Sequence, residues 1–387
     1  MNRRTFVRNG VAGGVGLASA SIASAAKEIA PTSETRSATP PASELDEVTI
    51  AELQSGMASG KYTARSLARK YLDRIDEVDK HGPAINSIIE LNPDALSIAT
   101  DLDKERKMKG PRGPLHGIPV LIKDNIDTHD RMTTTAGSLA LGGSIPLQDS
   151  SVAGRLRQAG AVILGKTNLS EWANFRSSHS TSGWSGRGGQ TKNPYVLDRN
   201  PCGSSSGTGA GVSANLSAIG VGTETDGSVV CPSSANSLVG IKPTVGLISR
   251  AGIIPISHNQ DTAGPMCRTV TDATILLWAL SGIDPRDEAT KLSAGKAQPS
   301  GWSFKGQWFG ENRSGKFFDP DGLKGARIGV HRKGFGFNDA VDKLMGDCID
   351  IMKKRGAVIV DPADIPTQGK FDESELEVLL YEFKAGL

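Results

Sequence analysis

Two strand-like apolar runs separated by a helix-like segment constrain the fold of this chain more than any other feature. Residues 118–122 (IPVLI) form a continuous apolar run, which is typical of a strand buried on both faces. The segment SVAGRLRQAG then predicts a helix, and AVILG after it predicts a second strand. The same order is predicted again later in the chain, with a strand over residues 326–330, a helix over 339–356 and a strand over 357–360. Strand, helix and strand at these lengths pair in parallel, so we expect an α/β fold.

Two helices are predicted ahead of the first apolar run. Thr49 followed by Glu52 is a capping-box pattern that opens the first helix, and Gly60 ends it. Thr63 can cap the second helix. One side of that helix carries Leu67, Tyr71, Leu72, Ile75 and Val78. We therefore expect one large domain from about residue 45 to residue 387.

The first 44 residues show no core-forming pattern. Arg3 and Arg4 begin a twin-arginine pattern, and a weak apolar stretch over residues 10–23 leads to a small-residue site, ASA. We expect a signal peptide over residues 1–26 and a periplasmic or secreted protein; a basic N-terminus without signal function is the alternative. Residues 27–44 predict a Pro/Ser/Thr/Ala-rich linker. The apolar stretch is too short to cross a bilayer, so no stable membrane insertion is expected.

The chain ends inside an amphipathic pattern. The segment SELEVLLYEFKAGL has apolar residues at Leu379, Leu380 and Phe383, and it stops at Leu387 without a polar tail. We interpret this as a helix interrupted by the end of the chain, that is, as a C-terminally incomplete domain.

Charge and residue spacing argue against several function classes. The chain has 44 basic and 42 acidic residues, a formal net charge of +2, which gives no basis for a nucleic-acid partner. The six histidines show no HExxH or similar pair, so neither a metal nor another cofactor is expected. Four cysteines lack CxxC spacing and are interpreted as unpaired or incidental thiols: Cys202, Cys231, Cys267 and Cys348.

A lysine and two serine-containing segments point to acyl transfer without histidine. Lys123 directly follows the buried run, where burial would keep its amine neutral and able to act as a base. The serines lie in PCGSSSGTGAGVSA and GTETDGSVV. A Gly-containing loop after an apolar strand can direct backbone N–H groups at one point, as an oxyanion hole requires. Each feature alone also fits a solvated strand end or a flexible loop, and residues 261–265 (DTAGP) are interpreted as a plain turn.

Together these segments resemble the amidase signature family, from about residue 45 to the end. GIPVLIKDNID, PCGSSSGTGAGVSA and GTETDGSVVCPSSANSLVGIKPTVGL carry the likeness. The last is most similar to the peptide amidases, which remove the C-terminal amide from peptides. The resemblance implies the amidase signature fold, a mixed, largely parallel twisted sheet flanked by helices on both faces. It also implies a small-molecule or peptide amide as substrate, and release of ammonia through an acyl-enzyme.

The resemblance also implies a Ser–cis-Ser–Lys triad. By motif, Ser228 matches the nucleophile, Ser204 the serine that relays the proton, and Lys123 the base. The relaying serine follows a cis peptide in the family, which places that bond here between Gly203 and Ser204, with Gly203 and Ser205 as supporting residues.

The oxyanion hole implied by the family would use four backbone N–H groups. They belong to Thr225, Asp226, Gly227 and Ser228. Where many members carry D-x-G-G-S, this chain has Glu-Thr-Asp-Gly-Ser over residues 224–228, so Asp226 adds a side chain beside the expected oxyanion hole.

Two alternatives stay open. Residues 203–207 (GSSSG) satisfy the G-x-S-x-G nucleophile elbow of α/β-hydrolases, with Ser205 as nucleophile and His258 or His331 as base. Against it, an elbow follows a buried strand, and the preceding segment is typical of turns. Alternatively, the chain is an inactive, truncated ligand-binding homologue, since family members continue past the YEFKAGL segment.

Overall fold

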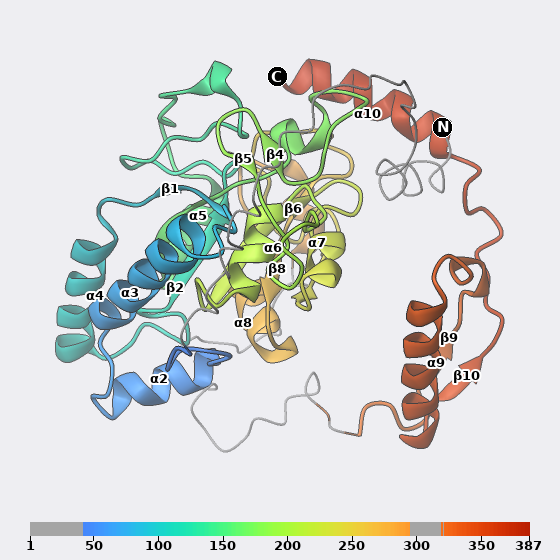
Figure 1. Cartoon of the computed structure of the whole chain (residues 1–387), viewed down its shortest axis with the longest axis horizontal. Helices are drawn as coiled ribbons and strands as arrows, with labels where there is room; N and C mark the ends of the chain where they lie inside the picture. Colours follow the sequence, from blue (N-terminus) through green and yellow to red (C-terminus); the bar gives the residue numbers. More distant parts are fainter. Residues whose placement is uncertain (1–41, 295–318, 320) are drawn as a thin grey trace, which may run out of the picture. The chain divides into compact units, whose positions relative to one another are not determined.

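The described part of the chain forms two compact units. The computed structural model describes residues 42–294, 319 and 321–387 (Figure 1). The larger unit comprises residues 42–294 together with Val378–Leu387, and the smaller unit comprises the other described residues, up to Glu377. The expected signal peptide and most of the expected linker lie outside the described residues. Their boundaries, and the single large domain expected after them, stay predictions.

A six-stranded mixed sheet forms the centre of the larger unit, in the order β1-β3-β2-β6-β8-β7. The strands are β1 (Ile88–Leu91), β2 (Pro119–Lys123), β3 (Val162–Thr167), β6 (Ile219–Glu224), β7 (Val239–Gly240) and β8 (Thr262–Cys267). β2 pairs in parallel with both β3 and β6, whereas the outer pairings are antiparallel. Every residue of β2, β3 and β6 is buried, as continuous apolar runs predict. The mixed sheet is confirmed, with its parallel part at the centre.

Helices flank this sheet, as predicted. They are α2 (Ile50–Ala58), α3 (Ala64–Arg74), α4 (Ala95–Lys109), α5 (Ser151–Gln158), α6 (Ser206–Ser213), α7 (Val230–Ala235) and α8 (Val270–Leu280). α6 contacts β2, β3, β6 and β8, and α8 contacts β8 and α5. Shorter pieces are a π-helical turn (Ile75–His81), a hairpin of β4 (Trp184–Ser185) with β5 (Gly189–Gln190), and 3-10 turns at Leu139–Leu141, Glu171–Asn174 and Glu288–Ser293.

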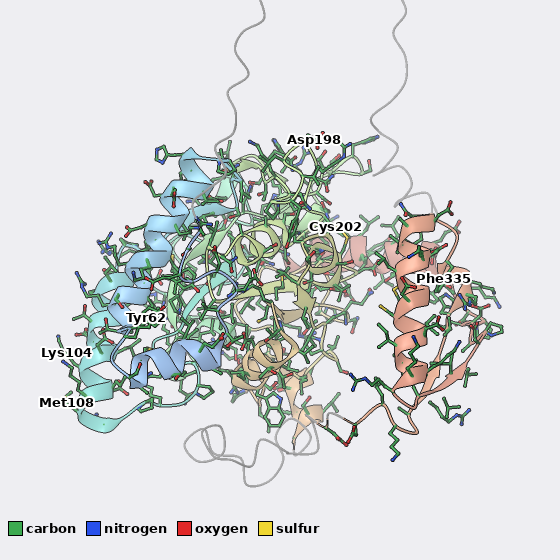
Figure 2. The ribbon with its side chains drawn as sticks, turned by 60° about the horizontal axis from the view of Figure 1, so that its bottom comes forward. Tyr62, Lys104, Met108, Asp198, Cys202 and Phe335 are labelled. Carbon is green, nitrogen blue, oxygen red and sulfur yellow. A yellow bond between two sulfur atoms is a disulfide. The ribbon has the colours of Figure 1, made fainter. Side chains whose placement is uncertain are left out.

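Local capping explains where the first helices begin. Thr49 and Glu52 form the predicted capping box of α2, and Thr63 caps α3. α3 packs against α4 along one side of the unit (Figure 1). Lys104 and Met108 point from α4 into solvent (Figure 2). These helices thus form an outer layer.

The smaller unit contains the second predicted strand–helix–strand pattern. β9 (Arg327–Gly329) and β10 (Val358–Val360) pair in parallel, and α9 (Asp339–Lys354) connects them, after a short 3-10 turn at Arg332–Gly334. The predicted helix and strands are therefore confirmed.

The amphipathic C-terminal pattern forms α10 (Asp372–Gly386), as predicted. Its last turns belong to the larger unit, where the Phe383 ring packs on the rings of Trp172 and Phe175. Within the described residues, no helix has both the length and the apolar character needed to span a membrane.

The interpretation of residues 261–265 as a turn is wrong, because β8 begins at Thr262. Val221 of β6 pairs with Pro265, whose carbonyl also accepts a hydrogen bond from the Ile241 N–H. Pairing with segments distant in sequence therefore overrides the local turn preference of Gly and Pro.

Candidate active site

Lys123 ends the buried strand β2, and its amine meets two other segments of the chain. Nζ lies 2.8 Å from Ser204 Oγ, 2.9 Å from Thr223 Oγ1 and 3.2 Å from the Thr223 carbonyl oxygen. The residue is 0% exposed. Burial lowers the pKa of Lys123 from 10.5 to about 7, although the nearby carboxylates of Asp261 and Glu224 oppose this shift. A neutral amine, which a base requires, is therefore available near neutral pH.

Ser204 lies in the turn that leads into α6. The Gly203–Ser204 peptide bond is cis, as the family resemblance implies. The Ser204 carbonyl accepts a hydrogen bond from the Ser170 N–H at 3.1 Å. A side chain at Gly203 would collide with Ser170 Oγ and Ser206 Oγ, which favours glycine there. The expected supporting role of Gly203 thus has a steric basis.

Ser228 lies in the loop between β6 and α7 and is 6% exposed. The Glu224 carboxylate shapes this loop, because it accepts hydrogen bonds from three backbone N–H groups. Oε1 accepts from Gly227 at 2.8 Å, and Oε2 accepts from Val229 at 2.7 Å and Val230 at 2.9 Å. Gly227 has φ +89°, a backbone conformation that favours glycine.

A backbone hydrogen bond joins the two serine segments. The Ser205 N–H donates to the Ser228 carbonyl oxygen at 3.1 Å. In the part of the chain that the structure describes, no hydrogen bond joins the hydroxyls of Ser204 and Ser228. The structure therefore brings Lys123 and Ser204 into direct contact and places Ser228 on the adjoining segment.

The four expected oxyanion donors differ in their surroundings. The Gly227 N–H is engaged by Glu224, so the expectation that it is available to an oxyanion does not hold in this conformation. The N–H groups of Thr225 and Ser228 donate to no acceptor among the described residues. The Asp226 side chain is exposed. The N–H groups of Thr225 and Ser228 are therefore candidate oxyanion donors, and the role expected of the Asp226 N–H stays a prediction.

A carboxylate that the sequence did not reveal supports this loop. Asp261 accepts a hydrogen bond from the Thr225 hydroxyl and two more from the N–H groups of Ile256 (2.8 Å) and Ser257 (2.9 Å). Burial raises the pKa of Asp261. Asn125 was also missed; its Nδ2 donates to Thr223 Oγ1 at 3.0 Å. Only their positions in the sequence could have indicated these two residues: Asn125 follows Lys123 by two residues, and Asp261 precedes a buried strand.

A cavity of about 220 Å³ opens beside these residues. Asn125, Thr223 and Thr225 line it together with the apolar segment from Ile253 to Ile256, and charged groups such as Arg250 and Asp287 stand on its wall.

Ser205 does not have the surroundings of an elbow nucleophile. Its Oγ donates to the Thr223 carbonyl at 3.1 Å and accepts from the Thr223 N–H at the same distance, so it supports β6. The described residues 191–203 before it contain no strand. His258 is exposed and paired with Glu382, and His331 lies in the smaller unit. The nucleophile-elbow alternative therefore loses its structural basis.

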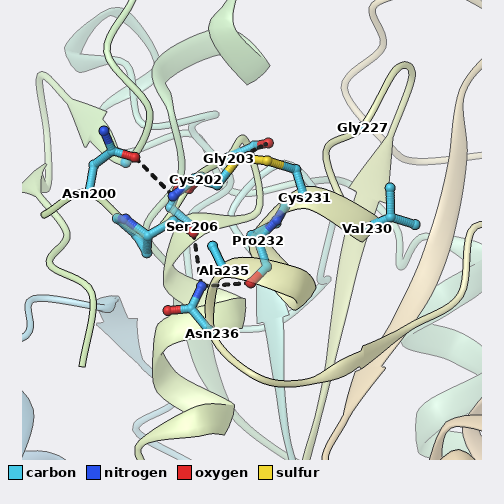
Figure 3. Close-up of a disulfide and its surroundings, with 12 residues drawn as sticks. Asn200, Cys202, Gly203, Ser206, Gly227, Val230, Cys231, Pro232, Ala235 and Asn236 are labelled. Carbon is cyan, nitrogen blue, oxygen red and sulfur yellow. Dashed lines mark hydrogen bonds between the residues drawn. A yellow bond between two sulfur atoms is a disulfide. The ribbon is translucent and has the colours of Figure 1, made fainter. Parts of the chain in front are cut away.

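The interpretation of four unpaired thiols is wrong for two of them. Cys202 and Cys231 form a disulfide, with 29 residues of separation and Cα atoms 6.0 Å apart (Figure 3). The fold brings them together through the pairing of their segments, which their spacing does not indicate. Cys267 and Cys348 are free. Across residues 42–294, 319 and 321–387, no group of His, Cys, Asp or Glu is arranged to hold a metal ion.

Comparison with known proteins gives a consistent result. The family model described as Amidase matches residues 66–386. A protein of Arabidopsis thaliana named "Probable amidase" is 45% identical over 349 residues, which are 89% of this chain and 64% of that protein. A protein of Arthroderma benhamiae named "Putative amidase" is 40% identical, over 86% of this chain and 57% of that protein.

Solved structures agree. Native peptide amidase from Stenotrophomonas maltophilia has a TM-score of 0.80 and 48% identity, over 89% of this chain and 67% of that chain. An amidase family protein from Bacillus anthracis has a TM-score of 0.80 and 38% identity, over 89% and 65%. The chain spans 64% of the length of the Arabidopsis relative and 57% of that of the Arthroderma relative.

Proposed function

The chain belongs to the amidase family, and from this premise we propose that it hydrolyses a carboxamide through an acyl-enzyme formed on Ser228. The observation that carries the proposal is the Lys123 amine, which is fully buried and lies 2.8 Å from Ser204 Oγ. With its pKa lowered to about 7, about half of this amine is in its neutral form at pH 7. A buried neutral amine that faces a serine hydroxyl is a general base.

The contacts of Lys123 suit this role atom by atom. A neutral amine has two N–H groups and one lone pair. The two N–H groups can serve the carbonyl oxygen and Oγ1 of Thr223, which leaves the lone pair toward Ser204 Oγ. In this state the Ser204 hydroxyl donates a hydrogen bond to the Lys123 amine.

In the proposed reaction the proton moves along this chain of groups. Ser228 Oγ attacks the carbonyl carbon and passes its proton to Ser204, which passes its own proton to Lys123. The oxyanion binds the N–H groups of Thr225 and Ser228; removing one such donor typically costs about 3 kcal/mol of transition-state stabilisation. The proton then returns to the leaving nitrogen, and ammonia departs. Water next attacks the acyl-enzyme and gives a proton to the same relay, which returns a proton to Ser228 Oγ as the carboxylic acid leaves.

The proposed substrate is a primary carboxamide such as the C-terminal amide of a peptide. The support is the 48% identity to the Stenotrophomonas maltophilia peptide amidase over 89% of this chain. The cavity beside Thr225, with its apolar segment from Ile253 to Ile256, offers space for an apolar side chain next to the reacting amide.

The cellular site is a separate proposal. The twin-arginine pattern at Arg3 and Arg4 supports a periplasmic or secreted enzyme that meets extracellular amides. The balanced charge gives no reason to propose a nucleic-acid partner.

The experiment measures ammonia release from a peptide amide and covalent labelling by a fluorophosphonate probe. We expect Ser228→Ala to abolish both, because it removes the nucleophile, and Ser205→Ala to keep measurable turnover. The opposite pattern, with Ser205→Ala inactive and Ser228→Ala active, would establish the nucleophile-elbow alternative. Amide binding without turnover or labelling in the unmodified chain would identify an inactive ligand-binding homologue.

A further inference from the structure

The Cys202–Cys231 disulfide joins the two segments that carry the serine pair. Cys202 precedes Ser204 by two residues, and Cys231 follows Ser228 by three. Figure 3 shows the bond crossing from the turn before α6 to the first turn of α7. Resting on the function proposed above, we propose that this disulfide is a positioning clamp, which limits how far the segments of Ser204 and Ser228 can move apart.

Each cysteine is bonded into the segment of its serine. On one side, the Cys202 N–H donates to Asn200 Oδ1 at 3.0 Å, and the Cys202 carbonyl accepts from Ser206 Oγ at 2.6 Å. On the other side, the Cys231 N–H donates to the Gly227 carbonyl at 2.8 Å. A displacement of either sulfur is therefore passed to the backbone beside Ser204 or to the loop that carries Ser228.

Few other bonds hold these two segments together. The Ser205 N–H donates to the Ser228 carbonyl at 3.1 Å. Asn236 Nδ2 donates to the carbonyls of Pro201 (2.9 Å) and Pro232 (2.6 Å), and so links the turn before Cys202 to α7 (Figure 3). Among these bonds the disulfide is the covalent one, and it joins the two segments within three residues of each serine.

Each of the two serines follows a glycine, so its segment has backbone freedom that a crosslink can restrict. Gly203 and Gly227 give their segments more backbone freedom than other residues would. Proton transfer between hydroxyls requires hydrogen-bond distance, and a displacement of about 1 Å can lower a rate by about 10²-fold. A crosslink beside both serines limits this displacement directly.

The clamp can be opened from solution. Cys202 is half-buried and Cys231 is exposed, so a small dithiol reaches the bond. Dithiothreitol supplies two electrons and two protons, which give the two thiols, while the reagent becomes a cyclic disulfide. Cys348 is an exposed free thiol in the smaller unit and provides a matched control for nonspecific thiol effects.

The test compares the oxidised and the reduced 387-residue chain with a peptide amide as substrate. We expect reduction to lower kcat by about 10-fold to 100-fold with little change in KM, and reoxidation to restore it. Hydrogen exchange at the Ser205 amide, which donates across to Ser228, should accelerate on reduction, while amides of β2 and β3 stay protected. Cys202→Ala/Cys231→Ala should behave as the reduced protein and ignore dithiothreitol, whereas Cys348→Ala should behave as wild type.

The two measurements, kcat and hydrogen exchange at the Ser205 amide, test the positioning role of the disulfide separately from the proposed function. Equal kcat in both redox states, with unchanged Ser205 exchange, would overturn the clamp. Faster exchange throughout the sheet would show a general stabilising bond and would also overturn a positioning role. If the oxidised chain releases no ammonia, the proposed function fails, and the exchange of the Ser205 amide alone still decides whether the disulfide holds the two segments together.

Discussion

Two lysines on neighbouring strands are both fully buried, yet their surroundings differ in kind. In the β2–β3 register Lys123 pairs with Thr167 and Lys166 with Ile122, so the two side chains leave opposite faces of the sheet. Lys123 Nζ contacts the hydroxyl of Ser204 and two oxygens of Thr223.

Lys166 instead ties a loop to the sheet. Its Nζ donates to the carbonyls of Ile126 (2.7 Å) and Thr133 (3.2 Å) and to the Thr134 hydroxyl (2.8 Å). Burial lowers the pKa of both lysines, and nearby carboxylates oppose this shift in each case. Around Lys123 they are Asp261 and Glu224. Around Lys166 they are Asp124, Asp130, Asp127 and Glu90. Burial alone therefore does not make a base. One hydroxyl beside Lys123 is that of Ser204, on the segment bonded to Ser228, whereas the hydroxyl beside Lys166 belongs to the loop that Lys166 ties to the sheet.

The largest effect we expect is on catalysis, from Lys123→Ala. Loss of the general base should lower kcat by up to about 10⁴-fold at neutral pH, and by less at high pH, where hydroxide can replace the base. Ammonia release from a peptide amide measures this, and thermal unfolding checks that the variant folds. Full activity at neutral pH would show that Lys123 is not the base and would remove the contrast between the two lysines.

The second effect is on stability, from Lys166→Met, which keeps side-chain length and removes the amine. We expect the free energy of unfolding to fall by about 3–5 kcal/mol, because buried carbonyls lose their donor and Asp124 loses a compensating charge. Urea unfolding measures the loss, and Lys104→Met, at an exposed position of α4, is the control with an expected change within about 0.5 kcal/mol.

The same variant also tests the separation of roles. Fluorophosphonate labelling of a separate sample counts the active sites. The kcat of Lys166→Met per active site should match that of wild type. A variant of normal stability with kcat lowered more than about tenfold would place Lys166 in the catalytic machinery after all.

Local patterns account for what the sequence predicted of the fold. The capping residues Thr49 and Thr63 act over three or four positions, and the apolar runs of β2 and β3 are contiguous, so both are visible in the sequence. β8 was not visible, because Gly264 and Pro265 disfavour a strand locally and only the pairing with β6 makes one.

The candidate site likewise has residues that the sequence revealed and residues that it did not. Lys123 and Ser204 lie in recognisable motifs, and the structure brings them together. The role of Asp261 depends on its proximity to Thr225, 36 residues away, and the partner of Cys202 lies 29 residues away. Such pairings have no local signal and require the fold.

The smallest expected effect is a pH dependence, and it sharpens the comparison most directly. A protonated amine has no lone pair for the Ser204 proton, so activity should be present above the Lys123 pKa of about 7 and lost below it, by about tenfold per pH unit. Since Lys166 faces no reacting group, Lys166→Met should leave this profile unchanged. Asp261→Asn should move the midpoint to lower pH, because the Asp261 carboxylate raises the pKa of Lys123. The amide oxygen can still accept from the N–H groups of Ile256 and Ser257, and the amide NH2 can donate to Thr225 Oγ1. A kcat/KM profile that is flat from about pH 5 to about pH 9, or a midpoint that rises in Asp261→Asn, would mean that the titrating group is not the amine beside Ser204.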